Sequence, residues 1–435
     1  MTNARARSSA LLHGGGRLVG FGLSVGLLAV SSLLLIPAMV DVGGQRAWGA
    51  IAVGQSIGAV GAVMIYFGWG HTGPAMIARA DAAAARTEFV DSLRTRMLLF
   101  VPVTTIACVV AAVVAPSHPL LSAAGCLSAA AVGFTSDWFF VGKRRPYAYL
   151  LLETVPRVLG TAVGILLLIS GAQVIAGPLC MLGGMLLGFA ATSCWVVLRD
   201  RPPVAEPRRT VRRVIVAQRA GVGSAVGTSA YSALPLVLIS LVAPGIQPAY
   251  ALVDKLQRQL SVALGPVVSV VQGYVPRRDP AVTIRRATRA LWAGAGFCAA
   301  LAAAVLVAAP WLFAWLGAGQ VQPEYAVMAL MAAFVGLNVW ESILARAVLA
   351  SFDRLDAAAR GTIISAVIGL PLVIAGALTL GLVGAFAGLL VGLLARTGYE
   401  LTVAVVHVRR GGRDASESEG AREPAEGARE SEERD

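Results

Sequence analysis

The feature that most constrains this chain is a series of apolar stretches of about 20 residues, the length of helix that crosses the roughly 30 Å hydrocarbon core of a bilayer. We count twelve such spans. They cover residues 17–40, 47–68, 97–115, 119–141, 147–170, 173–198, 218–243, 249–273, 288–316, 323–349, 357–380 and 383–408. Only 14% of the residues are charged, against about 25% in soluble domains. The sequence therefore predicts an all-α integral membrane protein with about twelve transmembrane helices.

Basic residues are concentrated in alternate loops, and this distribution predicts the orientation. The cations on the side of the N-terminus include Arg94, Arg96 and the turn 143–145, whereas the opposite side has Arg46 and almost nothing else. Because basic loops stay in the cytoplasm, both termini are expected there. The same pattern argues against a nucleic-acid-binding role for the net charge of +12, since the cations lie between apolar segments and form no patch on a soluble domain.

A self-comparison at an offset of 202 residues indicates an internal repeat. Matches in rare residues are the most informative, and they pair Trp48 with Tyr250, Gln45 with Gln247, Gln55 with Gln257, Pro74 with Pro276 and Trp138 with Trp340. Six spans fall in each half, so both halves enter from the same side. The prediction is two parallel six-helix lobes related by a pseudo-twofold axis along the membrane normal.

The expected domain organisation follows from these spans and from the charged segments between and beyond them. Residues 1–16 form a cytoplasmic tail, 17–198 the N-lobe, 199–217 a basic linker and 218–408 the C-lobe. Residues 409–435 are highly charged and are expected to be disordered.

Three segments carry a family resemblance. Residues 68–74 (Gly-Trp-Gly-His-Thr-Gly-Pro), 137–144 (Asp-Trp-Phe-Phe-Val-Gly-Lys-Arg) and 249–256 (Ala-Tyr-Ala-Leu-Val-Asp-Lys-Leu) resemble flippases of the Wzx type. These belong to the multidrug/oligosaccharidyl-lipid/polysaccharide exporter superfamily, which also holds multidrug and toxin extruders. The resemblance implies translocation of a polyprenyl-pyrophosphate-linked oligosaccharide to the outer leaflet of a bacterial plasma membrane, by alternating access with a cationic central cavity.

Charged residues at membrane depth are the candidates for substrate binding, because a pyrophosphate crossing hydrocarbon needs compensating cations and arginine pairs phosphate oxygens bidentately. Arg157 lies well inside its span, with Glu153 one turn earlier on the same face. Arg258 is placed similarly, with Asp254 one turn before it. Each pair could equally be a local ion pair that stabilises its helix in lipid.

The remaining candidates are less distinctive. Arg396 and Glu400 form another i, i+4 pair, while Arg17 and Arg219 open the first helix of each lobe, where they could capture a headgroup or serve as ordinary topology anchors. Asp137 and Glu341 lie near helix ends, where snorkelling would keep them hydrated. Asp137 and Glu153 are the acidic residues of the N-lobe available for ion coupling, and Asp254 and Glu400 are the corresponding counter-ion candidates in the C-lobe.

The sequence thus favours a flippase for lipid-linked oligosaccharide over two alternatives, which are a proton- or sodium-coupled extruder of the same fold and a non-transporting scaffold of a glycan-assembly complex. The first span lacks the acidic residue that extruders often place there. No long extracytoplasmic loop, nucleotide-binding loop or metal-type spacing of Cys or His is apparent, so neither an enzyme nor a cofactor is expected. The expected partners are the lipid-linked substrate, a coupling proton or sodium ion, membrane lipids, glycosyltransferases and a polysaccharide polymerase.

Overall fold

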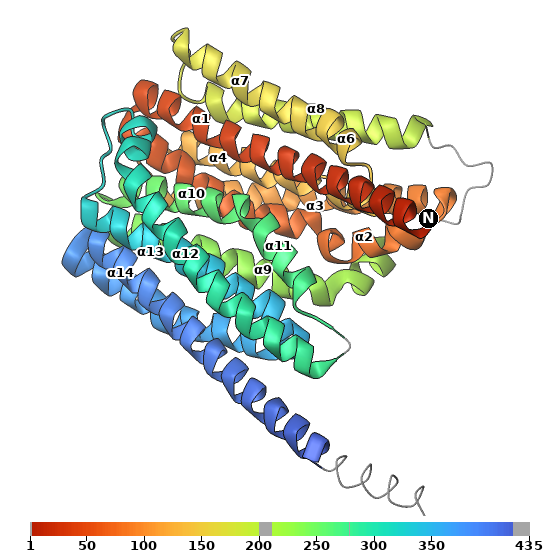
Figure 1. The fold of residues 1–435 in the computed structure, drawn as a ribbon. Helices are drawn as coiled ribbons and strands as arrows, with labels where there is room; N and C mark the ends of the chain where they lie inside the picture. Colours follow the sequence, from red (N-terminus) through yellow and green to blue (C-terminus); the bar gives the residue numbers. More distant parts are fainter. Residues whose placement is uncertain (1, 200–210, 278, 421–435) are drawn as a thin grey trace, which may run out of the picture. The chain divides into compact units, whose positions relative to one another are not determined.

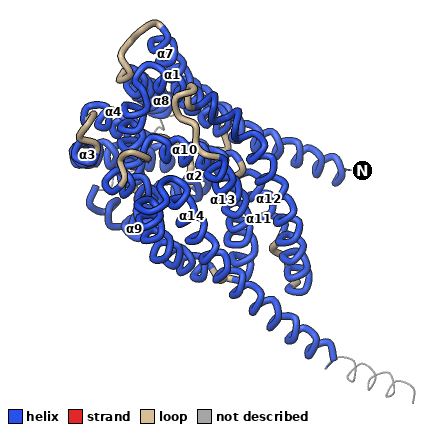
Figure 2. Tube along the Cα trace, turned by 90° about the vertical axis from the view of Figure 1, so that its left-hand side faces the viewer, coloured by secondary structure: helices blue, strands red, loops and turns tan. Residues whose placement is uncertain are grey.

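The computed structural model describes residues 2–199, 211–277 and 279–420, and every regular element in these ranges is helical (Figure 2). The α-helices of the first half are α1 (Thr2–Tyr66), α2 (Trp69–Arg79), α3 (Ala82–Val114), α4 (Pro119–Ala130), α5 (Asp137–Gly142), α6 (Pro146–Tyr149), α7 (Val155–Ile169) and α8 (Ala176–Arg199). Those of the second half are α9 (Val211–Val242), α10 (Gln247–Ala263), α11 (Gly265–Tyr274), α12 (Pro280–Leu316), α13 (Tyr325–Ile343) and α14 (Leu355–Gly420). Short 3-10 and π turns complete them: η1 (Ala131–Phe134), η2 (Leu150–Thr154), η3 (Leu344–Val348) and η4 (Leu349–Phe352).

The twelve expected spans can be traced in these helices. Nine described helices are long and apolar enough to cross a membrane. Two of them, α1 and α14, are too long for one crossing and contain a glycine with non-helical backbone, Gly44 (φ 74°) and Gly381 (φ 60°), between two expected spans. Helices α10 and α11 together cover the expected span 249–273. The prediction of an all-helical membrane fold is confirmed.

Helix α14 turns back on itself at Gly381. The evidence is contact between residues on opposite sides of that glycine: a methyl group on Gly376 would collide with the backbone of Gly384, and one on Gly392 would lie 2.8 Å from Cα of Gly369. Such close backbone approach is available only to residues without a side chain. The two halves of α14 are therefore an antiparallel helical hairpin.

The described chain divides into two compact units, shown with the whole chain in Figure 1. The first comprises Met1–Leu256 with Trp311–Pro323, and the second Gln257–Pro310 with Glu324–Asp435. Helix α9 packs against α1 and α3 inside the first unit. Helix also extends into both expected tails, since α1 begins at Thr2 and α14 continues to Gly420. Residues 200–210 of the expected linker and 421–435 of the tail lie outside the described residues, and the lobe boundaries stay a prediction.

An aromatic core in the first unit joins two of the segments that carry the family resemblance. Trp69 of α2 and Trp138 of α5 are both 1% exposed, and their ring centroids lie 5.0 Å apart. Phe89 of α3 stacks on Trp138 at 6.3 Å. Gly73 makes this packing possible, because a Cβ there would lie 2.5 Å from the Trp138 ring. The core fixes α5 beside α2 and so positions the start of α5, where Asp137 lies.

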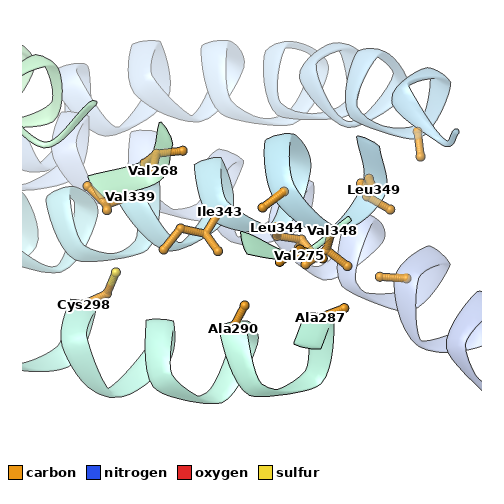
Figure 3. Close-up of a cluster of buried hydrophobic side chains, with 13 residues drawn as sticks. Val268, Val275, Ala287, Ala290, Cys298, Val339, Ile343, Leu344, Val348 and Leu349 are labelled. Carbon is orange, nitrogen blue, oxygen red and sulfur yellow. The ribbon is translucent and has the colours of Figure 1, made fainter. Parts of the chain in front are cut away.

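The core of the second unit is aliphatic. Buried side chains from α11, α12, α13 and η3 meet in one cluster, among them Val268, Ala290, Cys298, Val339 and Ile343 (Figure 3). Figure 3 shows the α12 side chains facing the side chains at the end of α13 and in η3. This packing holds the end of α13, and with it Glu341, inside the unit.

Candidate functional site

The polar centre of the first unit is built around a break in a transmembrane helix. Helix α4 ends at Ala130, η1 continues it to Phe134, and α5 starts only at Asp137, after Thr135 has taken an extended conformation (ψ 136°). A break of this kind releases backbone carbonyls and N–H groups from the helical ladder, and at membrane depth they must be satisfied by protein groups.

Arg96 satisfies the released carbonyls. Its Nη1 donates to the carbonyl oxygens of Phe134 and Thr135, each at 2.8 Å, and its side chain is completely buried. Nη2 reaches Oγ of Ser136 at 3.5 Å. The expectation that Arg96 is a loop cation that marks topology is wrong, because α3 begins at Ala82 and so carries Arg96 well inside the helix.

Glu153 and Arg157 reach the same break from the other side. Oε1 of Glu153 accepts the backbone N–H of Ser136 at 2.8 Å, and Nη1 of Arg157 contacts Oγ1 of Thr135 at 3.5 Å. Glu153 is 1% exposed and its Oε2 has no hydrogen-bond partner within the described residues. Glu153 and Arg157, which were predicted to share one helix face, thus bind two successive residues of the broken helix, Ser136 and Thr135.

Local sequence explains how this pair is presented. Glu153 lies in the π-helical turn η2, three residues before Pro156, whose missing N–H disturbs the helical ladder. Helix α8 approaches closely because glycines face the pair: a Cβ on Gly184 would lie 3.1 Å from Cα of Arg157, and one on Gly188 would lie 3.3 Å from Cα of Glu153. These glycines close off one side of the pair with backbone.

Tyr66 and Asp137 complete the group, which we name the break cluster: Tyr66, Arg96, Asp137, Glu153 and Arg157. The Tyr66 hydroxyl donates to Oδ1 of the half-buried Asp137 at 2.5 Å. Two cations face two carboxylates, so the break cluster is balanced in charge. Arg96 and Glu153 bind the backbone of the broken helix, which indicates that the break cluster stabilises an unusual backbone conformation.

Helix α10, in the expected span 249–273, is a second polar feature. Five of its six residues from 254 to 259 are polar or charged. Nζ of Lys255 donates to Oε1 of Gln55 in α1 at 3.0 Å. Asp254 is buried and Arg258 is half-buried. The predicted site residues Asp254 and Arg258 therefore lie in the polar middle of α10, together with Lys255.

In the second unit, Arg396 is the centre of an ion-pair cluster. Its Nε binds Oε1 of Glu400 at 2.9 Å, which confirms the predicted i, i+4 pair, and its Nη2 binds Oε1 of Glu341 at 2.5 Å. The Glu400 and Glu341 side chains are 0% and 4% exposed. The expectation that Glu341 stays hydrated at a helix end is wrong, because the aliphatic core buries the end of α13.

The remaining predicted residues lie apart from these groups. The side chains of Arg17 and Arg219 lie outside the described part of the structure, although their backbones belong to α1 and α9. Among the described residues no group of three or more His, Cys, Asp or Glu side chains is arranged to hold a metal ion.

The sequence reasoning missed Tyr66, Arg96, Lys255 and the partnership of Glu341. Two signals were available. Asp91, Ser92, Thr95 and Arg96 recur at helical spacing and are all buried on one face of α3. Lys255 is one of only two lysines in a chain that otherwise uses arginine, and it falls inside an expected span.

No protein-family model matches the sequence, and no curated protein sequence matches it either. Solved structures are similar in fold. An inward-facing multidrug resistance MATE family transporter of the MOP superfamily superposes with a TM-score of 0.61 at 15% identity, covering 91% of this chain and 96% of the other. A eukaryotic MATE transporter gives 0.55 at 13% identity, covering 94% and 99%.

A MOP superfamily transporter from Pyrococcus furiosus, described as having a binding pocket of reverse polarity that suggests a different function, gives a TM-score of 0.51 at 13% identity and covers 91% and 96%. These likenesses extend over almost the whole of both chains. The chain therefore has the all-helical, multi-pass fold of MATE family transporters of the MOP superfamily.

Proposed function

We propose that this protein is a flippase that moves a polyprenyl-pyrophosphate-linked oligosaccharide from the inner to the outer leaflet of a bacterial plasma membrane, with both termini in the cytoplasm. The oligosaccharide serves surface polysaccharide assembly, alongside the glycosyltransferases and polymerase that make and use it. The MATE-type fold supports transport in general. The resemblance of three sequence segments to Wzx-type flippases supports this substrate.

The observation that carries the proposal is the polar middle of α10. Lys255 and Arg258 are one turn apart in the expected span 249–273, so they present two cations on neighbouring positions of one face. A cation within a membrane span is expensive and marks a functional site by default. Two such cations match the charge of a pyrophosphate.

The experiment uses purified protein in sealed liposomes that contain a fluorescent polyprenyl-pyrophosphate oligosaccharide, with sidedness read by quenching. Arg258→Gln and Lys255→Gln are expected to lower the transfer rate at least tenfold, since each removes a charged contact of about 1.5–3 kcal/mol. Arg360→Gln is the matched control, because this arginine is exposed and pairs with the exposed Asp356. Equal transfer in all variants would contradict the role of α10.

An ion-coupled extruder is the second candidate, and the specific observation that favours it is the burial of carboxylates in both units. Glu153 and Glu400 are almost fully buried, and one oxygen of each lacks a hydrogen-bond partner among the described residues. Efflux of a cationic dye driven by a proton or sodium gradient, without lipid transfer, would support the extruder. A scaffold role would leave both assays negative with folded protein.

A further inference from the structure

Two cavities follow each other along one seam of the first unit, where α9 packs against α1 and α3. The deeper cavity, of about 250 Å³, is lined by residues within 57–64 of α1, 103–110 of α3 and 230–237 of α9. The outer cavity, of about 550 Å³, begins one helical turn further along each helix, at Val53, Val113 and Ser240. Because the three helices keep one register over both cavities, we treat the two as parts of one site, which we name the α9 seam.

The deeper cavity is an apolar groove. Its floor consists of the small, buried residues Gly61, Ala107 and Ala233. Large, exposed side chains surround this floor, among them Ile106 and Leu234. The lining side chains carry no hydrogen-bonding group, and they lie in the middle of three expected spans. The groove therefore fits a hydrocarbon chain, which gains from apolar contact and needs no polar partner.

The outer cavity is polar and contains a cation. Arg46, Ser117 and Ser240 line it, and α10 begins at its wall with Gln247 and Pro248. Arg46 is the cation on the expected outer side, against the usual distribution of basic residues. Within the described residues no carboxylate forms an ion pair with it. Since arginine binds phosphate oxygens bidentately and a helix N-terminus attracts anions, this cavity fits a phosphate headgroup.

Two serine hydroxyls hold α9 against its neighbours at the two ends of the groove. Oγ of Ser229 donates to the carbonyl oxygen of Ala59 in α1 at 3.5 Å. Oγ of Ser240 donates to the carbonyl oxygen of Val114 in α3 at 3.4 Å. Helix α9 is thus fixed where the groove begins and where it ends, and the small side chain of Ala233 leaves the space between. The groove is therefore a feature of how these helices pack.

The length of the α9 seam identifies the kind of lipid that it fits. On α1 the seam extends from Arg46 to Met64, a distance of about 27 Å along the helix. The groove begins at Ile57, about 17 Å from Arg46. A phospholipid with its headgroup at Arg46 ends near the bilayer midplane, at a depth of about 15 Å, and so stops where the groove begins. A polyprenyl chain, built of many isoprene units, is long enough to fill it.

We propose that the α9 seam binds the translocated lipid on the outer side of the membrane, with the pyrophosphate at Arg46 and the polyprenyl chain in the groove between α1, α3 and α9. The inference deepens the proposed function, on which its substrate and orientation rest. Helix α10 begins at the outer cavity and carries Lys255 and Arg258 about two and three turns deeper. One helix thus connects the proposed transport cations with this outer site.

The first test locates the chain without measuring transport. The purified full-length protein in lipid nanodiscs is mixed with a polyprenyl pyrophosphate that carries a diazirine half-way along its chain, irradiated and mapped by mass spectrometry. We expect labels on the residues that line the groove. Val103→Phe fills the groove and should remove these labels, whereas Val109→Phe, an exposed position of the same helix outside the cavity, should keep them. Labels that persist in a folded Val103→Phe variant would overturn the site.

The second test concerns the headgroup. Arg46→Gln should raise the probe concentration needed for half-maximal labelling about tenfold, as expected for the loss of a charge-assisted hydrogen bond. Arg360→Gln, which changes an exposed arginine of α14, should leave it unchanged. An excess of phosphatidylglycerol should not displace the probe. Displacement by phosphatidylglycerol at equal concentration, or equal labelling of Arg46→Gln and wild type, would make the seam a site for ordinary bilayer lipid and overturn the proposal.

The liposome transfer assay separates this site from the proposed function. Arg258→Gln should lose transfer and keep the labels in the groove, because Arg258 does not line the seam. Labelling that depends on Val103 and Arg46, in a wild type that transfers no lipid, would support the polyprenyl site and refute the flippase. Normal transfer with labels outside the groove would overturn the site and leave the flippase standing.

Discussion

The break cluster makes a sharp prediction about Arg96, whose guanidinium replaces a missing turn of helical hydrogen bonds. Arg96→Met replaces the charged guanidinium with an apolar group on a side chain of similar length, so packing is largely retained. The carbonyl oxygens of Phe134 and Thr135, each bound at 2.8 Å, lose their donor. Each buried acceptor left without a partner costs about 1–3 kcal/mol.

The charge balance of the break cluster adds to this cost. Removing Arg96 leaves Arg157 alone to compensate Asp137 and Glu153, and breaking a buried ion pair on one side costs about 3–5 kcal/mol. The two contributions overlap, because the carboxylates and carbonyls share the same guanidinium. We therefore expect a loss of about 3–5 kcal/mol in the free energy of unfolding. The stability of Arg96→Lys should lie between those of the wild type and Arg96→Met, since an ammonium supplies donors but lacks the planar fork of a guanidinium.

The assay is unfolding by SDS titration in mixed micelles, followed by the fluorescence of the eight tryptophans, which include the nearby Trp138. The control is Arg94→Met, two residues away on the same helix but exposed. A double variant with Glu153→Gln should lose less than the sum of the two single changes, by about 0.5–3 kcal/mol if the groups are coupled. If Arg96→Met lowers the free energy of unfolding by less than about 1 kcal/mol, and no more than Arg94→Met does, Arg96 does not stabilise the helix break, since surface substitutions have effects in that range.

Two further predictions concern glycines. In Gly73→Ala the new methyl would lie 2.5 Å from the rigid Trp138 ring. This overpacking should lower the free energy of unfolding by about 1–3 kcal/mol, measured by the same SDS titration. Unchanged stability and fluorescence would contradict the tight packing of α2 on α5. In Gly361→Ala the methyl would lie 2.5 Å from Oε1 of Glu400 and should weaken its ion pair, lowering the SDS midpoint. Gly398→Ala meets nothing within 4 Å and should leave stability unchanged or raise it by about 0.4–1 kcal/mol; similar losses in both variants would count against the contact.

Hydropathy was sufficient to predict the helical membrane fold, because span length is set by the bilayer and leaves a direct mark on the sequence. The breaks between helices at Gly44 and Gly381 were also predictable, since short non-span segments separate the apolar spans of the sequence there. The motifs at 68–74 and 137–144 were noticed as sequence resemblances only. Their packing into one aromatic core depends on tertiary contacts that spacing does not reveal.

The burial of Arg96 could not be predicted from hydropathy, because a window average places the start of its span after the charges. Helix α3 in fact begins at Ala82, capped by the Asp81 side chain, which accepts the N–H of Ala84 at 2.8 Å. The cap was readable in principle. The contact of Arg396 with Glu341 was not, because it joins two helices whose relative register is set by the aliphatic core and by the glycine hairpin of α14.

Comparing the charges of the three polar features narrows the choice of substrate ligands. In the break cluster, Arg157 is matched by carboxylates, and in the second unit Arg396 is more than matched. A pyrophosphate binding to either arginine must compete with carboxylates that are already in place. Helix α10 differs in that it carries two cations, Lys255 and Arg258, within one helical turn.

The proposed substrate should therefore depend most strongly on α10. We expect Arg258→Gln to lower lipid transfer more than Arg157→Gln does, and Arg157→Gln to lower stability more than Arg258→Gln does, because Arg157 is part of the network that holds the helix break. Measuring transfer and SDS unfolding for both variants separates the two roles. The opposite ranking, with Arg157 critical for transfer and neutral for stability, would place the pyrophosphate at the break cluster and make α10 the structural element.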